Sequence, residues 1–238
     1  MKVSVVIPAY NEEKLLGGTL DCIRAATGSL PQWEWELIVC DNNSTDRTPE
    51  VARRHGARVV FEPLNQISRA RNAGAAQASG DWLLFVDADS RVSAELLGAM
   101  IFEIQNGCIA GGATIVLDDV APFVQLWVKA WNLVSRINKW AAGSFIFCEA
   151  EAFREAGGFS LELYASEEID LFRRLKRLAH RRGRRIVILH RHPLHTSGRK
   201  AKLYTPWEMI RFSLKTALSG GRILKQRDEC FAWYDGRM

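Results

Sequence analysis

The stretch Leu83-Leu84-Phe85-Val86-Asp87-Ala88-Asp89 is the most informative part of the sequence, because an apolar run ends there in two carboxylates one residue apart. Four or more apolar residues bounded by polar ones are typical of a buried strand. Side chains alternate along a strand, so Asp87 and Asp89 should point in the same direction. Two such carboxylates repel each other, and a hard divalent cation with oxygen ligands would relieve the repulsion. On this stretch alone, a strand end whose Asp residues cap a following helix is the simpler interpretation.

Composition and charge describe an ordinary globular chain with a basic bias. The 238 residues are 47% hydrophobic and 25% charged, which suits one large domain or two halves that share a core. The net charge is +5, and much of the excess lies from Arg173 to Arg185 and on to Arg222. Such a bias favours anionic partners such as nucleotide diphosphates, nucleic acid or an anionic membrane. Nucleic acid is not expected, since the sequence has no zinc-finger spacing or RNA-binding signature.

The cysteines and the N-terminus predict a cytoplasmic protein. The five cysteines are scattered and form no Cys-x-x-Cys pair, which argues against a zinc or redox motif. Cys40, Cys108 and Cys148 lie in apolar surroundings, as expected of buried thiols in a reducing compartment. The first apolar run is too short for a signal peptide. No uncharged stretch approaches the roughly 20 residues of a membrane span, although peripheral membrane association stays open.

Apolar, β-branched runs alternate with helical patterns through the first 90 residues. The expected strands are Val3–Ile7, Leu37–Cys40, Arg58–Phe61 and Leu83–Val86. The helices between them are expected to begin at Glu12, Thr48 and Ile67. This order predicts an α/β fold with a doubly wound, mostly parallel sheet. Ligands of such sheets bind at the carboxyl ends of the strands, and no Gly-x-Gly-x-x-Gly dinucleotide fingerprint follows the first strand.

Four motifs, in order along the chain, resemble those of family 2 glycosyltransferases, which have the GT-A fold. They are residues 4–13 (SVVIPAYNEE), residues 38–48 (IVCDNNSTDRT), Asn65 with residues 70–74 (ARNAG), and Asp87-Ala88-Asp89. The resemblance covers residues 3–200. It implies a single GT-A domain (1–200) whose mixed sheet is flanked by helices, with a nucleotide-sugar half (1–90) and an acceptor half (91–200). A C-terminal amphipathic tail (201–238) follows.

The resemblance implies a donor site for a nucleotide diphosphate sugar. The residues that would line the nucleobase and ribose are Pro8, Ala9, Tyr10 and Glu12 or Glu13. Asp41 would accept a hydrogen bond from the base or ribose, and Arg71 would lie near the diphosphate or brace the carboxylates. Without the resemblance, Asp41 fits a turn residue that caps the next helix equally well. Arg71 alone fits a solvated charge on a helix better.

The same resemblance assigns the metal site. Asp87 would face the ribose or sugar, and Asp89 would bind Mg²⁺ or Mn²⁺, which neutralises charge on the leaving diphosphate. Many GT-A enzymes complete the metal site with a histidine from the segment after the last strand. In this sequence the last strand is expected at residues 186–189, and three histidines follow it. Neutral imidazole is a good divalent ligand; His195 is the preferred candidate, with His192 close behind. Arg199 would close over the diphosphate.

A candidate general base lies in the acceptor half. Residues 166–171 (SEEIDL) resemble the family's Glu-Asp-x-Asp motif, with Glu168 at the Asp position. Helical spacing places Glu168 on the face that points inward and Asp170 on a face that can pair with arginines. Glu168 would take the proton from an acceptor hydroxyl. The alternative is that Ser166 caps the helix while both glutamates complement its dipole.

Three segments leave a membrane contact open. Phe123, Trp127, Trp131 and Val134 form one apolar helix face, which is most simply core. The alternative is an interfacial surface that meets lipid, made by Trp127, Trp131 and Trp140 with Lys129, Arg136 and Lys139. Residues 181–185 (RRGRR) fit a solvated helix end or an anionic membrane surface. The tail from Pro206 would pack on the domain, pair with a second subunit or lie on a membrane, and the oligomeric state is not indicated.

Together these features predict a metal-dependent, inverting glycosyltransferase, with a UDP-sugar favoured as donor and the acceptor unidentified. A sugar nucleotidyltransferase is an alternative, but that class would have a Gly-rich basic loop where this chain has Pro8-Ala9-Tyr10-Asn11. The second alternative is a non-catalytic nucleotide-sugar-binding protein. The presence of Asp87, Asp89 and Glu168 argues against it.

Overall fold

The computed structural model describes residues 1–199, 203 and 206–234. Residues 200–202, 204–205 and 235–238, which include the start and end of the expected tail, lie outside the described residues. In the described part of the chain, no helix is both long and apolar enough to pass through a membrane.

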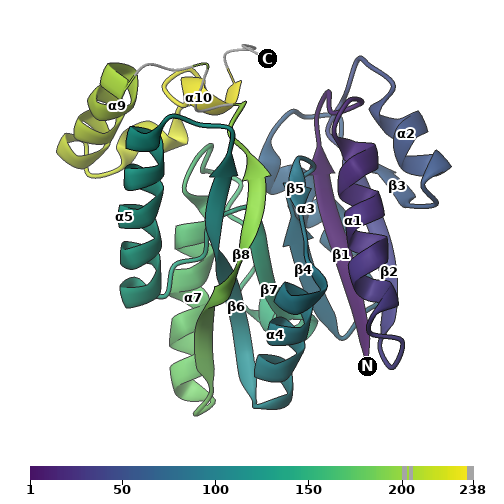
Figure 1. The fold of residues 1–238 in the computed structure, drawn as a ribbon. Coiled ribbons are helices and arrows are strands. Elements are labelled where there is room, and N and C mark those ends of the chain that lie inside the picture. The colour runs from purple at the N-terminus through teal and green to yellow at the C-terminus, as the bar shows by residue number, and fades with distance from the viewer. Residues whose placement is uncertain (200–202, 204–205, 235–238) are drawn as a thin grey trace.

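One mixed, mostly parallel sheet of eight strands forms the centre of the molecule (Figure 1), in the order β3-β2-β1-β4-β7-β6-β8-β5. The strands are β1 (Lys2–Ala9), β2 (Glu34–Asp41), β3 (Arg58–Phe61), β4 (Trp82–Val86), β5 (Ser90–Arg91), β6 (Cys108–Asp118), β7 (Phe145–Glu149) and β8 (Arg185–Ser197). The first four pair in parallel. β7 is antiparallel to both β4 and β6 and joins the two halves of the sheet, so the expected α/β class and doubly wound mixed sheet are confirmed.

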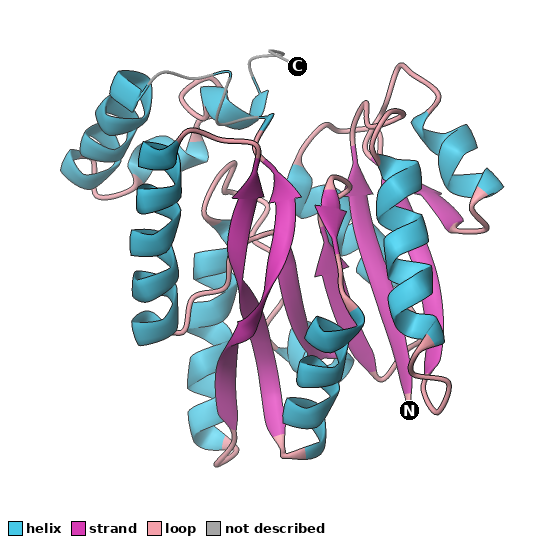
Figure 2. Cartoon of the chain, viewed as in Figure 1, coloured by secondary structure: helices cyan, strands magenta, loops and turns pink. Residues whose placement is uncertain are grey.

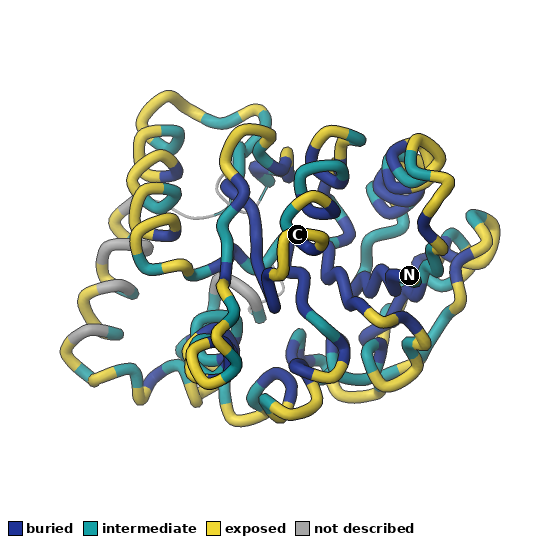
Figure 3. The backbone as a smooth tube through the Cα atoms, turned by 90° about the horizontal axis from the view of Figure 1, so that it is seen from below, coloured by how far each residue is buried: buried dark blue, intermediate teal, exposed yellow. Residues whose placement is uncertain are grey.

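Helices cover both faces of the sheet (Figure 2). They are α1 (Leu16–Gly28), α2 (Thr48–Arg54), α3 (Ile67–Ala76), α4 (Ala94–Gln105), α5 (Pro122–Asn138), α6 (Ala150–Glu155), α7 (Glu167–Arg181), α9 (Pro206–Leu218) and α10 (Phe231–Tyr234), with a 3₁₀ turn η1 at Arg222–Lys225. α1 and α4 supply apolar side chains to one core layer. α6 and α7 supply them to the other. Buried chain lies mainly in the middle of the molecule and exposed chain around its rim (Figure 3).

Three expected boundaries are wrong. β1 continues through Pro8 and Ala9, which pair in register with Cys40 and Asp41 of β2. Pro8 lies past the last residue that pairs with β4, where a missing N–H is tolerated. The helix that was expected from Glu12 begins only at Leu16. Residues 13–15 form a turn instead, in which the Leu15 and Leu16 N–H groups both donate to the Glu12 carbonyl.

The last strand is the third difference, because β8 runs to Ser197 and does not end near Leu189. Its polar second half pairs with β6 on one side and with the two-residue strand β5 on the other. Backbone pairing on both sides holds a segment whose residues 190–193 are mostly exposed, so the apolar pattern alone underestimated the strand. The extension carries residues 195–197 to the loop that follows β4.

α5 covers an edge of the sheet with side-chain hydrogen bonds. β7 pairs only with Ala110–Gly112 of β6, so the rest of that edge lacks a neighbouring strand. The Asn132 amide accepts from the Ile115 N–H at 3.1 Å and donates to the Ile115 carbonyl at 2.8 Å. Gln125 donates to the Leu117 carbonyl at 2.6 Å. These contacts satisfy backbone groups that an open sheet edge would leave unpaired.

Candidate active site

The loops after β1 and β2 are joined into one rim at the carboxyl edge of the sheet. Asn11 has a left-handed φ of 53°. Its N–H donates to Ser44 Oγ at 3.0 Å, and its side-chain oxygen accepts from the Thr45 N–H at 2.8 Å. Glu13 extends the rim, since its N–H donates to Asp46 Oδ2 at 3.1 Å. Acidic side chains at Glu12 and Glu13 are therefore held in a fixed loop before the helix.

Asp41 and Asn42 organise the neighbouring turn. Asp41 is buried and accepts a hydrogen bond from the Ser44 N–H at 3.1 Å, as a turn residue would. Asn42 donates to the Leu64 carbonyl at 2.7 Å and accepts from the Gln66 N–H at 2.9 Å. Asn42 thus ties the loop after β2 to the segment before α3, a role that the sequence did not reveal.

The predicted base-lining residues lie at this edge together. Pro8 and Ala9 are buried as the last residues of β1, whereas the Tyr10 side chain is 37% exposed at the rim. Glu12 accepts a hydrogen bond from the Arg199 guanidinium at 2.5 Å. Arg199 lies just beyond β8, so this ion pair brings the two ends of the predicted domain into contact.

Arg71 is the central charge of the site. Its guanidinium is 1% exposed and lies over the ring of Phe159, 5.1 Å from the centroid. One terminal nitrogen donates to Glu167 Oε1 at 2.7 Å. The other donates to Asp87 Oδ1 at 3.1 Å and to the Gly143 carbonyl at 2.9 Å. A buried guanidinium needs such partners, and these three join the end of β4 to the start of α7.

The first turn of α7 presents two adjacent glutamates with different surroundings. Glu167 is buried on Arg71, whereas Glu168 is half-buried and forms no ion pair with a described residue. The alternative in which Ser166 caps the helix is wrong, because its side chain makes no capping hydrogen bond and its φ is +61°. Asp170 pairs with Arg174 at 2.7 Å, so the expected outward pairing of that carboxylate is confirmed.

Glu168 has a strongly perturbed acidity. Burial and the negative charge of Glu167 together raise the pKa of Glu168 to about 8, because the opposing effect of Arg71 is smaller than either. A carboxyl group with a pKa near neutrality can both accept and release a proton. Perturbed acids of this kind are concentrated at functional sites. The sequence did not single out Glu167, because its partner Arg71 is 96 residues away in the chain and becomes its neighbour only in the fold.

Asp87 and Asp89 lie in a turn and not in the strand. β4 ends at Val86, and the Ser90 N–H donates to the Asp87 carbonyl at 3.2 Å. The alternation argument therefore does not apply to this pair, and each carboxylate has its own neighbour. Asp87 contacts Arg71, whereas Asp89 accepts a hydrogen bond from the Thr196 hydroxyl at 3.2 Å. The Ser197 N–H also donates to the Asp89 carbonyl at 3.2 Å.

The structure places His195 away from Asp89, on the opposite side of the strand from Thr196. Its Nδ1 lies 3.0 Å from Asp118 Oδ1, and Asp118 is also paired with Arg91. Thr196 faces Asp89, and neighbouring side chains on a strand point to opposite faces. His192 is exposed. Among residues 1–199, 203 and 206–234, no group of three or more His, Cys, Asp or Glu side chains is arranged to hold a metal.

Hard oxygen donors are nevertheless present at Asp89. Its carboxylate and the Thr196 hydroxyl are 3.2 Å apart, and Mg²⁺ commonly takes only one or two protein carboxylates, with substrate phosphate and water as its other ligands. The donor set therefore fits an ion that a bound diphosphate completes. Thr196 was missed from the sequence because the second half of β8 was expected to be a loop.

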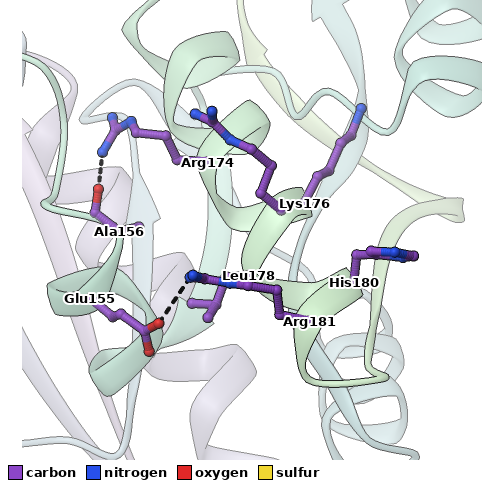
Figure 4. A pocket seen from close by; sticks show the side chains of 8 residues that line it. Glu155, Ala156, Arg174, Lys176, Leu178, His180 and Arg181 are labelled. Atoms are coloured by element: carbon purple, nitrogen blue, oxygen red, sulfur yellow. Dashed lines mark hydrogen bonds and ion pairs between the residues drawn. The ribbon is translucent and has the colours of Figure 1, made fainter.

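A surface hollow on the outer side of α7 lacks all of these groups. Figure 4 shows Glu155, Arg174, Arg181 and neighbouring residues around it. Arg174 donates to the Ala156 carbonyl, and Arg181 pairs with Glu155 at 3.1 Å. These cations are engaged in pairs that hold α6 to α7. The hollow is therefore a structural junction and not the predicted donor site.

Comparisons with known proteins agree with this architecture. An uncharacterised glycosyltransferase of Mycobacterium tuberculosis is 38% identical over 105 residues, which are 44% of each chain. Poly(ribitol-phosphate) β-N-acetylglucosaminyltransferase TarS of Staphylococcus aureus is 32% identical over 41% of this chain and 18% of its own. The chain thus spans less than half the length of these relatives.

Solved structures share the fold at low sequence identity. A crystal structure of Staphylococcus aureus TarS has a TM-score of 0.65 at 19% identity, covering 98% of this chain and 68% of that one. Glucosyl-3-phosphoglycerate synthase from Mycobacterium tuberculosis, with Mn²⁺ and UDP, has a TM-score of 0.60 at 20% identity, covering 96% and 80%. The profile of the family described as glycosyl transferase family 2 matches residues 4–152, more than half of the sequence. The chain belongs to glycosyl transferase family 2.

Proposed function

We propose that this protein is a metal-dependent, inverting glycosyltransferase that moves a sugar from a nucleotide diphosphate sugar to an acceptor hydroxyl. One observation carries the proposal. Arg71 joins Asp87, at the donor edge of the sheet, to Glu167, beside the acidic group with a raised pKa on α7. One buried charge would thereby hold the proposed donor site and the proposed proton acceptor together.

The donor would lie along the carboxyl edge of β1, β2 and β4. Pro8, Ala9 and Tyr10 would line the nucleobase, with Asp41 as hydrogen-bond acceptor and Glu12 or Glu13 toward the ribose. TarS has been crystallised with UDP and with UDP-GlcNAc, and a Pyrobaculum calidifontis mannosyltransferase of similar fold with GDP-Man and Mn²⁺. These complexes support a nucleotide-sugar donor, and the two TarS complexes favour UDP.

The diphosphate would be met by Asp89, Thr196 and Arg199. A Mg²⁺ or Mn²⁺ ion held by Asp89 would neutralise the negative charge of the departing diphosphate. Arg199 would exchange its pair with Glu12 for a phosphate oxygen, which binds a guanidinium in the same forked geometry. His195 would join the metal only by leaving Asp118, so we assign it a lesser part than Asp89.

Glu168 would act as general base. Its carboxylate takes the proton from the acceptor hydroxyl while that oxygen forms a bond to the anomeric carbon. The bond from that carbon to the diphosphate oxygen breaks on the opposite side, and the electron pair leaves with the nucleotide diphosphate. Direct displacement inverts the anomeric carbon. Asp87, held by Arg71, would orient the sugar for this attack.

A thermal-shift panel tests the donor site. UDP-glucose, UDP-GlcNAc and GDP-mannose are each added with and without Mn²⁺. We expect at least one to raise the Tm of the wild type in Mn²⁺, and D89N to lose the Mn²⁺-dependent part of that increase. E162Q, at an exposed carboxylate that pairs with Lys225, is the matched control. If no sugar nucleotide raises the Tm in metal, the proposed donor site is wrong.

A further inference from the structure

The outward face of α5 is a continuous apolar surface. Six large side chains lie on it, all exposed: Phe123, Leu126, Trp127, Leu133, Val134 and Ile137. Their spacing of three, four and seven residues places them on one stripe of the helix. Leu126, Trp127 and Ile137 are 69%, 64% and 71% exposed. The stripe runs from Phe123 to Ile137 along α5, a distance of about 21 Å.

The opposite face of α5 packs against the sheet. Val128 and Ser135 are its buried residues, and Asn132 and Gln125 hold the edge of β6. The stripe is therefore not part of the core. Contiguous apolar patches on a soluble surface usually mark an interaction site. Of the three tryptophans that were expected to share an interfacial surface, only Trp127 is exposed, since Trp131 and Trp140 are half-buried.

The charges on α5 itself have one sign. α5 contains Lys129 and Arg136, both exposed, and no Asp or Glu. Lys139 follows at its end, and Lys176 of α7 donates to the Asn138 carbonyl there. Arg173 and Lys176 both lie over the ring of Trp140. Burial, together with Lys139 and Arg173, lowers the pKa of Lys176, as expected where cations are crowded.

We propose that the outward face of α5 binds an anionic membrane surface, lying in its interfacial plane. An amphipathic helix with aromatic and aliphatic side chains on one face and cations beside them is suited to that position. A second copy of this chain is a poorer occupant. Pairing the stripe with itself would bring the cations of both copies together without acidic partners from α5. Negatively charged lipid headgroups complement those cations.

Vesicle co-sedimentation tests the proposal without any donor or turnover, so its outcome is independent of the proposed activity. The full chain is mixed with vesicles of phosphatidylcholine, with or without phosphatidylglycerol. We expect partitioning onto the anionic vesicles and little onto the neutral ones. L126E combined with I137E should lower that partitioning by about tenfold or more. F102E, at a 62% exposed phenylalanine of α4, should change it by less than about twofold.

A second variant separates charge from folding. K129Q combined with R136Q leaves the stripe intact and should weaken binding several-fold, as should high salt. The proposal is overturned if the wild type does not bind anionic vesicles, or if the stripe variant binds as well as F102E while keeping the wild-type Tm. It is equally overturned if the wild type sediments as a dimer that L126E/I137E dissociates, because a second copy then occupies the face.

Discussion

At the scale of single residues, the site depends on which carboxylates Arg71 pairs with: it pairs with Asp87 and Glu167 but not with Glu168. Arg71 neutralises Glu167 and Asp87 by direct contact, whereas Glu168 feels its charge without pairing. Glu168 is therefore left with the effects of burial and of the neighbouring Glu167, both of which raise its pKa. The assignment of Glu168 as base rests on this contrast. Helical spacing alone had placed Glu168 on the inward face, whereas the structure buries Glu167 more deeply than Glu168.

The acidity of Glu168 predicts a pH dependence of activity. A base with a pKa of about 8 is mostly protonated at lower pH, so kcat/KM should rise roughly tenfold for each pH unit up to about 8 and then level off. E168Q should lower transfer by about 10²-fold or more and keep the Tm increase caused by the nucleotide sugar. D170N, on the outward face, is the control. Full activity of E168Q would rule out this base.

The same pKa predicts an effect on stability. The pKa of Glu168 is higher in the folded protein than in the unfolded chain, so the folded state binds the proton more tightly. The tighter proton binding of Glu168 in the folded state stabilises the fold fully at pH values below the pKa of the unfolded chain. This stabilisation is lost as the pH rises toward 8. Glutamine carries no such charge. We expect E168Q to match the wild type near pH 4.5 and to exceed it by about 1–3 kcal/mol at pH 9 in urea unfolding; the reverse order would contradict the raised pKa.

Arg71 itself gives a prediction about a buried charge. R71K keeps the positive charge, but a single lysine amine cannot replace the planar guanidinium that donates to Glu167, Asp87 and the Gly143 carbonyl at once. We expect a loss of about 2–4 kcal/mol in the free energy of unfolding and a weaker Tm increase with the nucleotide sugar. R69K, at a half-buried arginine of the same helix, should change both by little. Equal effects of the two substitutions would show that Arg71 is not special.

At the scale of elements, local patterns predicted short apolar strands set between polar turns, whether buried like β4 or partly exposed like β3, and failed where strand pairing acts alone. β4 and β3 were expected within one residue of their observed bounds, since each is a short run set between polar turns. The second half of β8 has polar residues and Pro193, and it is a strand because β6 and β5 flank it. Thr196 was missed for this reason, since a long-range pairing cannot be deduced from composition. The resemblance identified the motifs of the site and offered the carboxylates as one set of partners for Arg71, but it did not identify Glu167, the Gly143 carbonyl or the partner of His195.

The covered edge of β6 gives an element-scale prediction. N132A removes both hydrogen bonds to Ile115 and leaves a half-buried N–H and carbonyl without them. The expected cost is about 1–3 kcal/mol in the free energy of unfolding, measured by urea titration. N138A is the control, because the Asn138 amide donates to the Val134 carbonyl of the same helix and not to the edge of β6. If both variants lose the same stability, the edge contacts of α5 contribute nothing of their own.

At the scale of the whole molecule, the described part of the tail braces the acceptor half. Ile223 and Cys230 are buried. The Leu224 carbonyl accepts from the Tyr164 N–H at 2.7 Å, and the rings of Tyr164 and Tyr234 are 5.5 Å apart. The Tyr234 hydroxyl accepts from the Ile67 N–H at 3.3 Å. Residues 222–234 thus hold the loop that leads into Glu167 and Glu168, although they are remote from them in the sequence.

This arrangement predicts that the end of the chain supports catalysis from a distance. I223D should detach residues 222–234, because a buried carboxylate without a partner is costly. The core sheet makes its own contacts, so we expect the Tm to fall only slightly while limited proteolysis begins to cut after Arg222 or Lys225. Transfer should weaken through kcat, since the loop before α7 no longer holds Glu168 in place. L214D, at a 57% exposed leucine of α9, should leave both proteolysis and kcat unchanged. If I223D is cut as proposed and yet keeps the wild-type kcat, the tail is an appendage and the position of Glu168 is determined by Arg71 and α7 alone.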